Sequence, residues 1–205
     1  STGKRHAFVH GYDVGYDDEG RILALDLTLA SRCGFSADLS GPINDRAVFH
    51  ADNAYWLPDV AIHSYRCRTN TVSDTAFRGF GGPQGMFAIE TVIDEVARAT
   101  GRDPLDVRKA NLYGVDERNV TPFGMTIEDN IAPPLIDRLE TTSRYRERRA
   151  EIASWNRTSP TIRRGLALTP VKFGISFTAT HYNQAGALIH VYQDGTVLLN
   201  HGGTE

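Results

Sequence analysis

The sequence predicts an α+β fold with two lobes, because strand-like and helix-like periodicities are segregated along the chain. Residues 21–30 alternate apolar and polar side chains, as a half-buried strand does. Residues 84–100 instead place apolar side chains at helical spacing, and from residue 164 onward the period is again that of strands. Strands followed by helices and then by strands are typical of α+β proteins rather than of alternating α/β proteins.

The first two strands are expected to pair as an antiparallel hairpin. Residues 6–17 are rich in β-forming side chains, and the stretch 18–20 (Asp-Glu-Gly) supplies turn chemistry before residues 21–30. The leucines of the second strand share one face, which we expect to be buried: Leu23, Leu25, Leu27 and Leu29.

The middle of the chain is predicted to be mainly helical. A short helix over residues 44–54 and a strand over residues 60–68 lead to the clearest helix, residues 84–100, which is expected to stop at Gly101. The apolar positions of that helix follow i, i+3, i+4 spacing: Met86, Ile89, Val92, Ile93, Val96 and Ala97.

Two further helices are predicted after it. Asp103-Pro104 is a cap-and-first-turn pair that starts a helix over residues 105–113. Residues 113–134 read as a loop, and residues 135–153 as a third, charged helix. Its arginine-rich part, residues 144–149, is expected to be a solvated face rather than a binding patch.

The last part of the chain is predicted to form three strands. Residues 165–180 and 186–203 carry strand periodicity, and Asp194-Gly195 indicates a hairpin turn between the last two strands. We therefore expect a first subdomain over residues 1–115, a helical and loop connection over 116–160, and the start of a second subdomain over 161–205.

Composition argues against several functional classes. A formal net charge of -3 and a pI near 6.2 give no basic field, so no nucleic-acid partner is expected. No run of 18 apolar residues is present, so no membrane span is expected.

Cys33 and Cys67 lack metal-ligand spacing and are expected to be reduced and buried, in a cytoplasmic protein. A start without methionine and an end directly after a strand lead us to expect a piece of a longer polypeptide.

One glycine-rich stretch, TAFRGFGGPQG over residues 75–85, is a candidate binding loop. One interpretation is structural: a phenylalanine packs in the core and Arg78 caps a carboxylate. The other is that Phe80 projects into a cavity while the glycines let backbone approach a ligand. Phe177-Thr178, at a predicted strand end, and Arg46, in the short helix, are further candidates. From the residues alone an ordinary strand is the favoured interpretation of Phe177-Thr178, and Arg46 could as easily be a surface residue.

Several blocks together resemble the molybdenum-cofactor domain of the xanthine dehydrogenase family of molybdenum hydroxylases. They are TAFRGFGGPQGMFAIETVIDEVA with RTN just ahead, GPINDRAVFHADNAY, DPLDVRKANLYG, PVKFGISFTATHYNQAGALIHVYQDGTV and HGGTE. They occur in the family's order and cover most of the 205 residues. The resemblance implies two mixed α/β lobes of a molybdopterin-binding domain.

The resemblance also implies roles for individual residues. Arg46 matches the arginine that contacts the purine and stabilises negative charge developing on it. Phe80 matches the aromatic that stacks on the substrate ring, while Phe177 and Thr178 match a second, edge-on aromatic and a hydroxyl near the substrate's polar edge. Arg78, Gly79 and Phe80 match the loop whose backbone lies beside molybdenum, with no side-chain ligand to the metal.

The implied activity is hydroxylation of purines, from hypoxanthine to xanthine to urate, with oxygen derived from water. Molybdenum is held by a pterin, and electrons pass through 2Fe-2S clusters and FAD, on other domains or a small subunit, to NAD; the assembled enzyme is expected to be a dimer. The family's two active-site glutamates fall outside these 205 residues, so the chain alone is expected to be inactive. An aldehyde oxidoreductase or other heterocycle hydroxylase on the same scaffold, and a non-catalytic scaffold segment, are the alternatives; Arg46 favours a purine.

Overall fold

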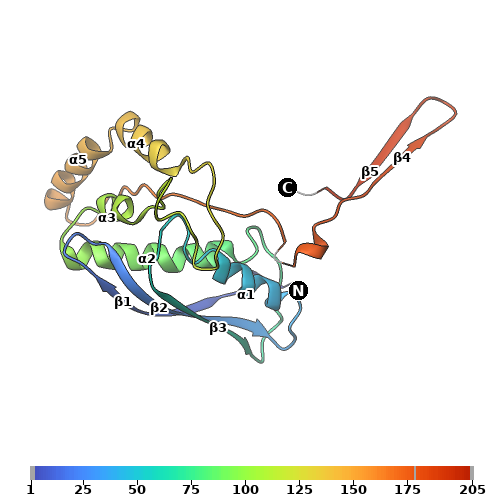
Figure 1. The fold of residues 1–205 in the computed structure, drawn as a ribbon, viewed down its shortest axis with the longest axis horizontal. Helices are drawn as coiled ribbons and strands as arrows, with labels where there is room; N and C mark the ends of the chain where they lie inside the picture. Colours follow the sequence, from blue (N-terminus) through green and yellow to red (C-terminus); the bar gives the residue numbers. More distant parts are fainter. Residues whose placement is uncertain (1–2, 178, 204–205) are drawn as a thin grey trace. The chain divides into compact units, whose positions relative to one another are not determined.

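The computed structural model describes residues 3–177 and 179–203. The chain divides into two compact units, Ser1–Phe173 and Gly174–Glu205 (Figure 1). Helices and strands both contribute substantially to the described residues, so the predicted α+β class is confirmed. The subdomain boundaries predicted at residues 115 and 160 stay a prediction.

A three-stranded sheet forms one layer of the first unit. Its strands are β1 (Phe8–Tyr16), β2 (Ile22–Gly34) and β3 (Val60–Arg68), in the order β1-β2-β3. β1 is antiparallel to β2, as the predicted hairpin requires, whereas β3 is parallel to β2. A parallel neighbour needs a crossover connection, and α1 (Ser40–Phe49) supplies it.

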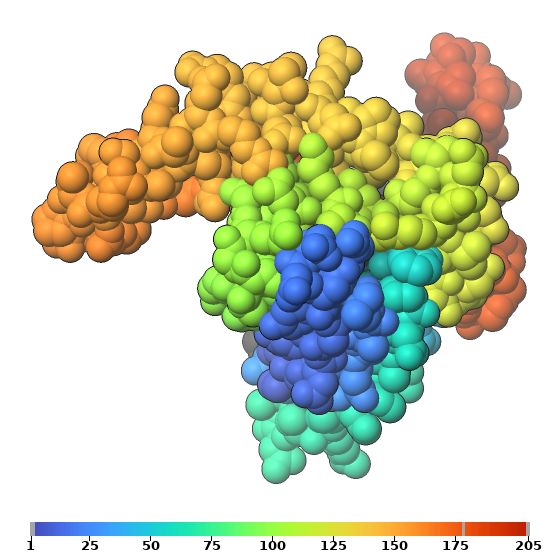
Figure 2. Space-filling model, turned by 60° about the vertical axis from the view of Figure 1, so that its left-hand side comes forward, coloured from blue at the N-terminus to red at the C-terminus, as the bar shows by residue number. Residues whose placement is uncertain are grey.

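Helices form the other layer. α2 (Gly82–Thr100) lies along one face of the sheet, with α1 beside its first turns (Figure 1). α3 (Pro104–Asn111) follows after a short turn. The hairpin turn between β1 and β2 lies against this turn, since Arg102 Nε donates to Asp18 O at 2.9 Å; Figure 2 shows the blue hairpin beside the green residues that follow α2.

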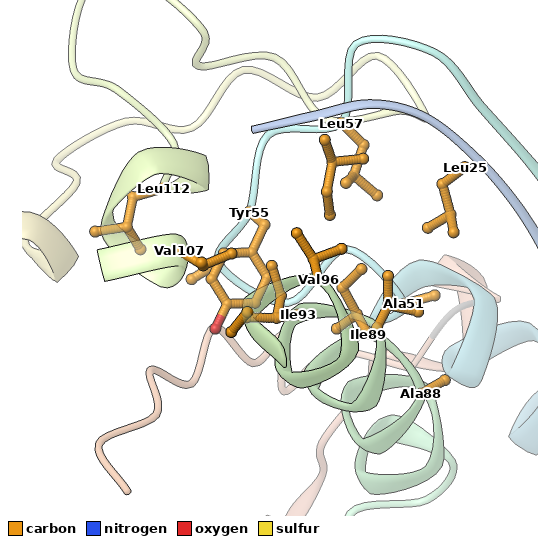
Figure 3. Packing of buried hydrophobic residues seen from close by; sticks show 14 of the residues in the cluster. Leu25, Ala51, Tyr55, Leu57, Ala88, Ile89, Ile93, Val96, Val107 and Leu112 are labelled. Carbon is orange, nitrogen blue, oxygen red and sulfur yellow. The ribbon is translucent and has the colours of Figure 1, made fainter. Parts of the chain in front are cut away.

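The core lies between β2 and α2. Leu27 is fully buried and shares the cluster with Ile89 and Ile93 of α2 and with Val107 of α3 (Figure 3). The expected helical face is thus the buried one, except that Met86 at its start is only half-buried. The one polar atom of the Tyr55 side chain has a hydrogen-bond partner in this core, because the Tyr55 hydroxyl donates to Glu90 Oε1 at 2.6 Å.

The predicted leucine face needs one correction. Leu25, Leu27 and Leu29 are buried, but Leu23 is 54% exposed and Ile22 is buried at 2% in its place. The register shifts at the start of β2, where Tyr16 pairs with Ile22 although Gly15 pairs with Ala24. Such a bulge adds one residue to one strand and moves the side chains before it to the opposite face.

Cysteine burial and two helix predictions also need correction. Cys33 is buried as expected, but Cys67 near the end of β3 is exposed. The short helix α1 starts four residues earlier than predicted and ends at Phe49 rather than at residue 54.

The predicted third helix is in fact two helices, α4 (Ala132–Thr142) and α5 (Tyr145–Thr158). The break lies at Arg144, whose φ of 54° is left-handed and cannot continue an α-helix. The arginines of the start of α5 remain largely solvent-facing and pair within the chain; Arg146, for example, donates to Asp106 at 2.5 Å.

The strand predicted over residues 165–180 is wrong: no described residue of this segment belongs to a strand. Its backbone groups bond to side chains instead of to a neighbouring strand. Asn53 Nδ2 donates to Pro170 O at 3.0 Å, and Lys172 N donates to Asn53 Oδ1 at 3.0 Å. Pro170 has no N–H to donate to a neighbouring strand. The strand-like sequence pattern of this segment is therefore not accompanied by strand pairing.

The second unit consists of a 3-10 turn, η1 (Thr180–Tyr182), and an antiparallel hairpin of β4 (Ala187–Val191) and β5 (Val197–His201). The predicted Asp194-Gly195 turn is confirmed: Gly195 has a φ of 82°, and Asp194 accepts from the Thr196 amide at 2.9 Å. Every residue of the two strands is exposed.

Candidate functional site

Arg46 is the charged centre of the candidate site. It lies in the last turn of α1 and is only 5% exposed, so the surface-residue interpretation is wrong. Its guanidinium carbon lies 5.7 Å from the ring centroid of Phe80 and 5.4 Å from that of Phe173. Both distances are within the range of a cation–π contact. Burial lowers the pKa of the Arg46 guanidinium from its usual value, but arginine still remains charged at neutral pH.

An unusual backbone turn presents Phe80. Three consecutive residues have positive φ: 87° at Gly79, 49° at Phe80 and 99° at Gly81. The left-handed region costs a non-glycine residue roughly 1–2 kcal/mol, and such strain concentrates at functional sites. A hydrogen bond of 2.8 Å from the Phe80 amide to the Phe77 carbonyl holds the turn. The strained residue is therefore the one whose ring contacts the buried arginine.

The glycines of the loop have a packing role that sequence reasoning did not anticipate. A Cβ on Gly81 would lie 2.0 Å from the Ile43 carbonyl oxygen, and one on Gly85 would lie 2.1 Å from the Ala47 carbonyl oxygen. These glycines let the start of α2 cross α1 at close range. We expected the glycines to bring the backbone close to a cofactor. At Gly81 and Gly85 the backbone instead lies close to α1.

The outer part of the loop is held from the amino-terminal segment. Arg5 Nη2 donates to the Arg78 carbonyl at 2.5 Å, and the Arg5 guanidinium lies 4.4 Å from the Phe77 ring centroid. Arg78 itself is exposed. Sequence reasoning missed Arg5, because nothing in the chain order connects it with a loop more than seventy residues later.

The loop also leads into an uncapped helix end. Gly81 at the N-cap offers no side chain to α2, and the first turn contains no acidic residue. The amide end of a helix carries partial positive charge and favours anionic groups. The amides of Gly82 and Gln84 already donate to the Gly79 and Gly81 carbonyls, so what this end of α2 offers a negatively charged ligand is its dipole and the nearby charge of Arg78.

A second group of buried polar residues lies next to Arg46 along the chain. His50 Nδ1 bonds to the Arg46 carbonyl at 2.8 Å, and burial lowers the pKa of its imidazole. Asp52 accepts from the Tyr113 hydroxyl at 2.6 Å and from Lys172 Nζ at 2.5 Å. Burial raises the pKa of Asp52 while Lys172 opposes that rise. The segment that sequence reasoning assigned to a strand is thereby tied to the end of α1.

Phe177 and Thr178 belong to the second unit. Phe177 exchanges two hydrogen bonds with the Asn183 side chain, at 2.6 and 2.9 Å, and its ring meets Tyr182 edge-on with centroids 5.6 Å apart. Thr178 lies outside the described residues. The expectation that Phe177 and Phe80 face the same substrate stays a prediction.

The described residues contain neither a cluster of metal-ligating side chains nor a helix that could span a membrane. Within residues 3–177 and 179–203 no three side chains of histidine, cysteine, aspartate or glutamate gather as a metal site. In the same part of the chain no helix has the length and apolar character needed to cross a membrane.

Comparison with protein families and curated relatives gives a consistent result. Two family models described as molybdopterin cofactor-binding domains match residues 1–112 and 138–205. The chain is 47% identical to a xanthine dehydrogenase of Drosophila subobscura and 46% identical to a xanthine dehydrogenase/oxidase of Gallus gallus, each over 204 residues. It is 44% identical over 207 residues to a nicotinate hydroxylase of Emericella nidulans. These alignments cover 100% of this chain and 15% of each relative.

Solved structures agree on the fold. The aldehyde oxidoreductase of Desulfovibrio gigas superposes with a TM-score of 0.70 at 23% identity, covering 96% of this chain and 21% of that one. A carbon monoxide dehydrogenase of Oligotropha carboxidovorans gives a TM-score of 0.61 at 21% identity, covering 73% of this chain and 19% of that one.

Proposed function

Because the chain belongs to the molybdopterin cofactor-binding domain family, with xanthine dehydrogenases among its relatives, we propose that it forms the molybdenum-cofactor-binding part of a xanthine dehydrogenase. The substrates are purines, hydroxylated from hypoxanthine to xanthine to urate. The observation that carries the purine assignment is the buried guanidinium of Arg46 against the Phe80 ring.

The loop around Arg78 and Gly79 fits an anionic pterin. The uncapped start of α2 and the adjacent Arg78 favour negative charge, and the positive φ of Gly79 holds a turn that leaves Arg78 exposed. When bound, the molybdenum–pterin group supplies the oxygen-transfer and electron-accepting chemistry. The chain's own part is to hold the loop, through Arg5 and the backbone turn, in the conformation that receives it.

The substrate side of the site is built from charge and rings. Phe80 offers an aromatic face on which a flat heterocycle stacks. Arg46 stabilises the negative charge that develops on the purine, and a fixed charge in a site shielded from water acts strongly because no solvent screens it. Phe177, edge-on, and Thr178, as a hydroxyl partner at the polar edge of the purine, complete the proposed site.

The remaining components lie on other domains or on a small subunit. The chain spans 15% of the length of the relatives it matches, which are xanthine dehydrogenases and a nicotinate hydroxylase. We place 2Fe-2S clusters, FAD and the reaction with NAD on those further parts, in a dimeric cytoplasmic enzyme.

A second candidate is hydroxylation of another heterocycle. The nicotinate hydroxylase of Emericella nidulans is 44% identical to this chain, nearly as similar as the xanthine dehydrogenases. A pyridine carboxylate and a purine are both flat and electron-poor, so the same arginine and rings suit both.

Steady-state assays of the purified full-length protein, normalised to its molybdenum content, test the proposal. We expect stoichiometric molybdenum, and kcat/KM for xanthine at least about tenfold above the value for an aromatic aldehyde, since a charge-stabilising contact contributes that much or more. Nicotinate is assayed beside them to separate the two candidates, and the proposal expects xanthine to be the better substrate. A preference for nicotinate would favour the second candidate. Absence of molybdenum from protein expressed with cofactor supply would contradict both.

A further inference from the structure

Phe173 lies within one of the family-like sequence blocks, but neither the resemblance nor the proposed function gives it a role. Its ring lies between three groups of the first unit. The Arg46 guanidinium carbon is 5.4 Å from its centroid, and the His50 ring is 4.8 Å away, centroid to centroid. The third neighbour is the backbone of Gly82, where an added Cβ would lie 2.5 Å from Phe173 Cε2. The ring thus packs against the end of α1 and the first turn of α2.

Phe173 is not an ordinary core residue. It is 38% exposed, whereas Arg46 beside it is 5% exposed. If Phe173 were an ordinary core residue, its ring would be buried and the Arg46 guanidinium would face water. In the structure the arginine is the more buried of the two. The two rings, Phe80 at 5.7 Å and Phe173 at 5.4 Å, cover the guanidinium and restrict its orientation.

The segment that carries Phe173 is anchored on its amino-terminal side. Both ends of the Asn53 amide bond to it, at Pro170 O and at Lys172 N. Lys172 Nζ pairs with the buried Asp52 carboxylate. Asp52 and Asn53 lie three and four residues after the end of α1, the helix that carries Arg46. The ring that covers this arginine is therefore anchored close to the same helix.

We infer that Phe173 is a positioning residue for Arg46, and through it a determinant of substrate specificity, in the purine site proposed above. It acts through the arginine. By covering one side of the guanidinium it holds the charge where a heterocycle stacked on Phe80 develops negative charge. A substrate that develops no charge at that place gains little from this arrangement.

The test uses the full-length enzyme and four variants: Phe173→Leu, Phe173→Tyr, Gly82→Ala and the double variant Gly82→Ala/Phe173→Leu. Phe173→Leu should lower kcat for xanthine about tenfold, because small misplacements of a catalytic group reduce rates by such factors. An aromatic aldehyde should change less than about twofold, and Phe173→Tyr, which keeps the ring, should stay within about twofold of the parent on both substrates.

Gly82→Ala tests the geometry directly, since its new methyl group meets the Phe173 ring. It should lower the xanthine rate as Phe173→Leu does. The double variant should be no worse than either single variant, because leucine removes the ring atoms with which the methyl group collides; contacting residues give such non-additive effects. Additive losses would overturn the inference.

A matched control and a binding measurement complete the test. The control is Phe49→Leu, the same substitution at a phenylalanine of α1 that is 39% exposed and contacts Phe123. It should leave the ratio of the xanthine rate to the aldehyde rate unchanged. Urate affinity, measured by calorimetry, should fall with Phe173→Leu and not with Phe49→Leu. Equal losses on xanthine and aldehyde per molybdenum, or no loss on either, would overturn the positioning role. If the parent enzyme itself fails to hydroxylate xanthine, the proposed function fails, while non-additive unfolding free energies of the Gly82 and Phe173 variants would still report their contact.

Discussion

The two hairpins of this chain have similar sequence patterns and very different surroundings. Both β1–β2 and β4–β5 are rich in β-forming apolar side chains and turn at a glycine with positive φ, Gly20 in the first and Gly195 in the second. In the first, Leu27 is fully buried beneath α2; in the second, Leu199 is 53% exposed. In these two hairpins the apolar β-forming sequence therefore indicates the strands, but not what covers them.

The difference lies in the helices. β2 is covered because α2 packs along the sheet and α1 fixes the start of α2 through glycine contacts. Among the described residues of the second unit, the only helical element beside β4–β5 is the single 3-10 turn η1. An isolated two-stranded hairpin is at best marginally stable in water, so mutations in the first unit should change the stability of the chain more than mutations in β4–β5.

The largest effect is expected from closing the gap between α1 and α2. Gly81→Ala puts a methyl group 2.0 Å from a carbonyl oxygen at a φ of 99°, so both overpacking and backbone strain oppose folding. We expect a loss of about 3 kcal/mol or more in the free energy of unfolding, measured by chemical denaturation. Gly101→Ala is the control: its φ of 68° is also left-handed, but its Cβ would meet nothing, so a loss of only about 1 kcal/mol is expected. Equal losses would show that the crossing is not tight.

A paired leucine truncation compares the hairpins directly. Leu27→Ala should reduce the free energy of unfolding of the 205-residue chain by about 3 kcal/mol, as large-to-small core substitutions do. Leu199→Ala should change it by less than about 0.5 kcal/mol. A large effect at Leu199 in this chain would mean that the second hairpin is covered after all.

The smallest effect is expected from pH, and it is confined to the first unit. Burial is the main cause of the lowered pKa of both His6 and His50, so folding favours their neutral forms. The unfolded chain then binds more protons below its own histidine pKa of about 6.5, and stability should fall as pH decreases from there. Denaturation at pH 7.5 and pH 5.5 measures the fall. It should be smaller in His50→Gln, and an unchanged pH dependence would remove His50 from the explanation.

Much of the first unit could be predicted from sequence because its signals are local. Helical spacing located α2 to within two residues, and Asp103-Pro104 marked the start of α3, where the Asp103 side chain accepts from the Leu105 amide at 2.9 Å. The bulge at Ile22 and the break at Arg144 could not be predicted, because each is a backbone irregularity with no single residue type that requires it. The extended segment ending at Phe173 depends on Asn53, a long-range partner that periodicity does not report.

The candidate site shows the same limit. Family motifs singled out Arg46 and Phe80, and the structure brings these two together from α1 and from the loop before α2. Phe173 and Arg5 were missed because their importance comes from contacts across more than seventy residues of chain, with Arg46 and with Arg78 respectively. Glycine-rich sequence indicated a close approach correctly; only the structure shows that Gly81 and Gly85 approach α1.

The central claim is that Arg46 stabilises charge on a purine, and one pair of assays tests it most directly. Arg46→Met keeps the length and apolar stem of the side chain and removes its charge and donors. In the cofactor-loaded full-length protein we expect kcat for xanthine to fall by a factor on the order of a hundred or more, because the contact is stronger in the transition state than in the ground state. An aromatic aldehyde, with no heterocycle to carry the charge, should lose much less. Equal losses on xanthine and aldehyde, per molybdenum bound, would contradict the claim and reduce Arg46 to a folding role.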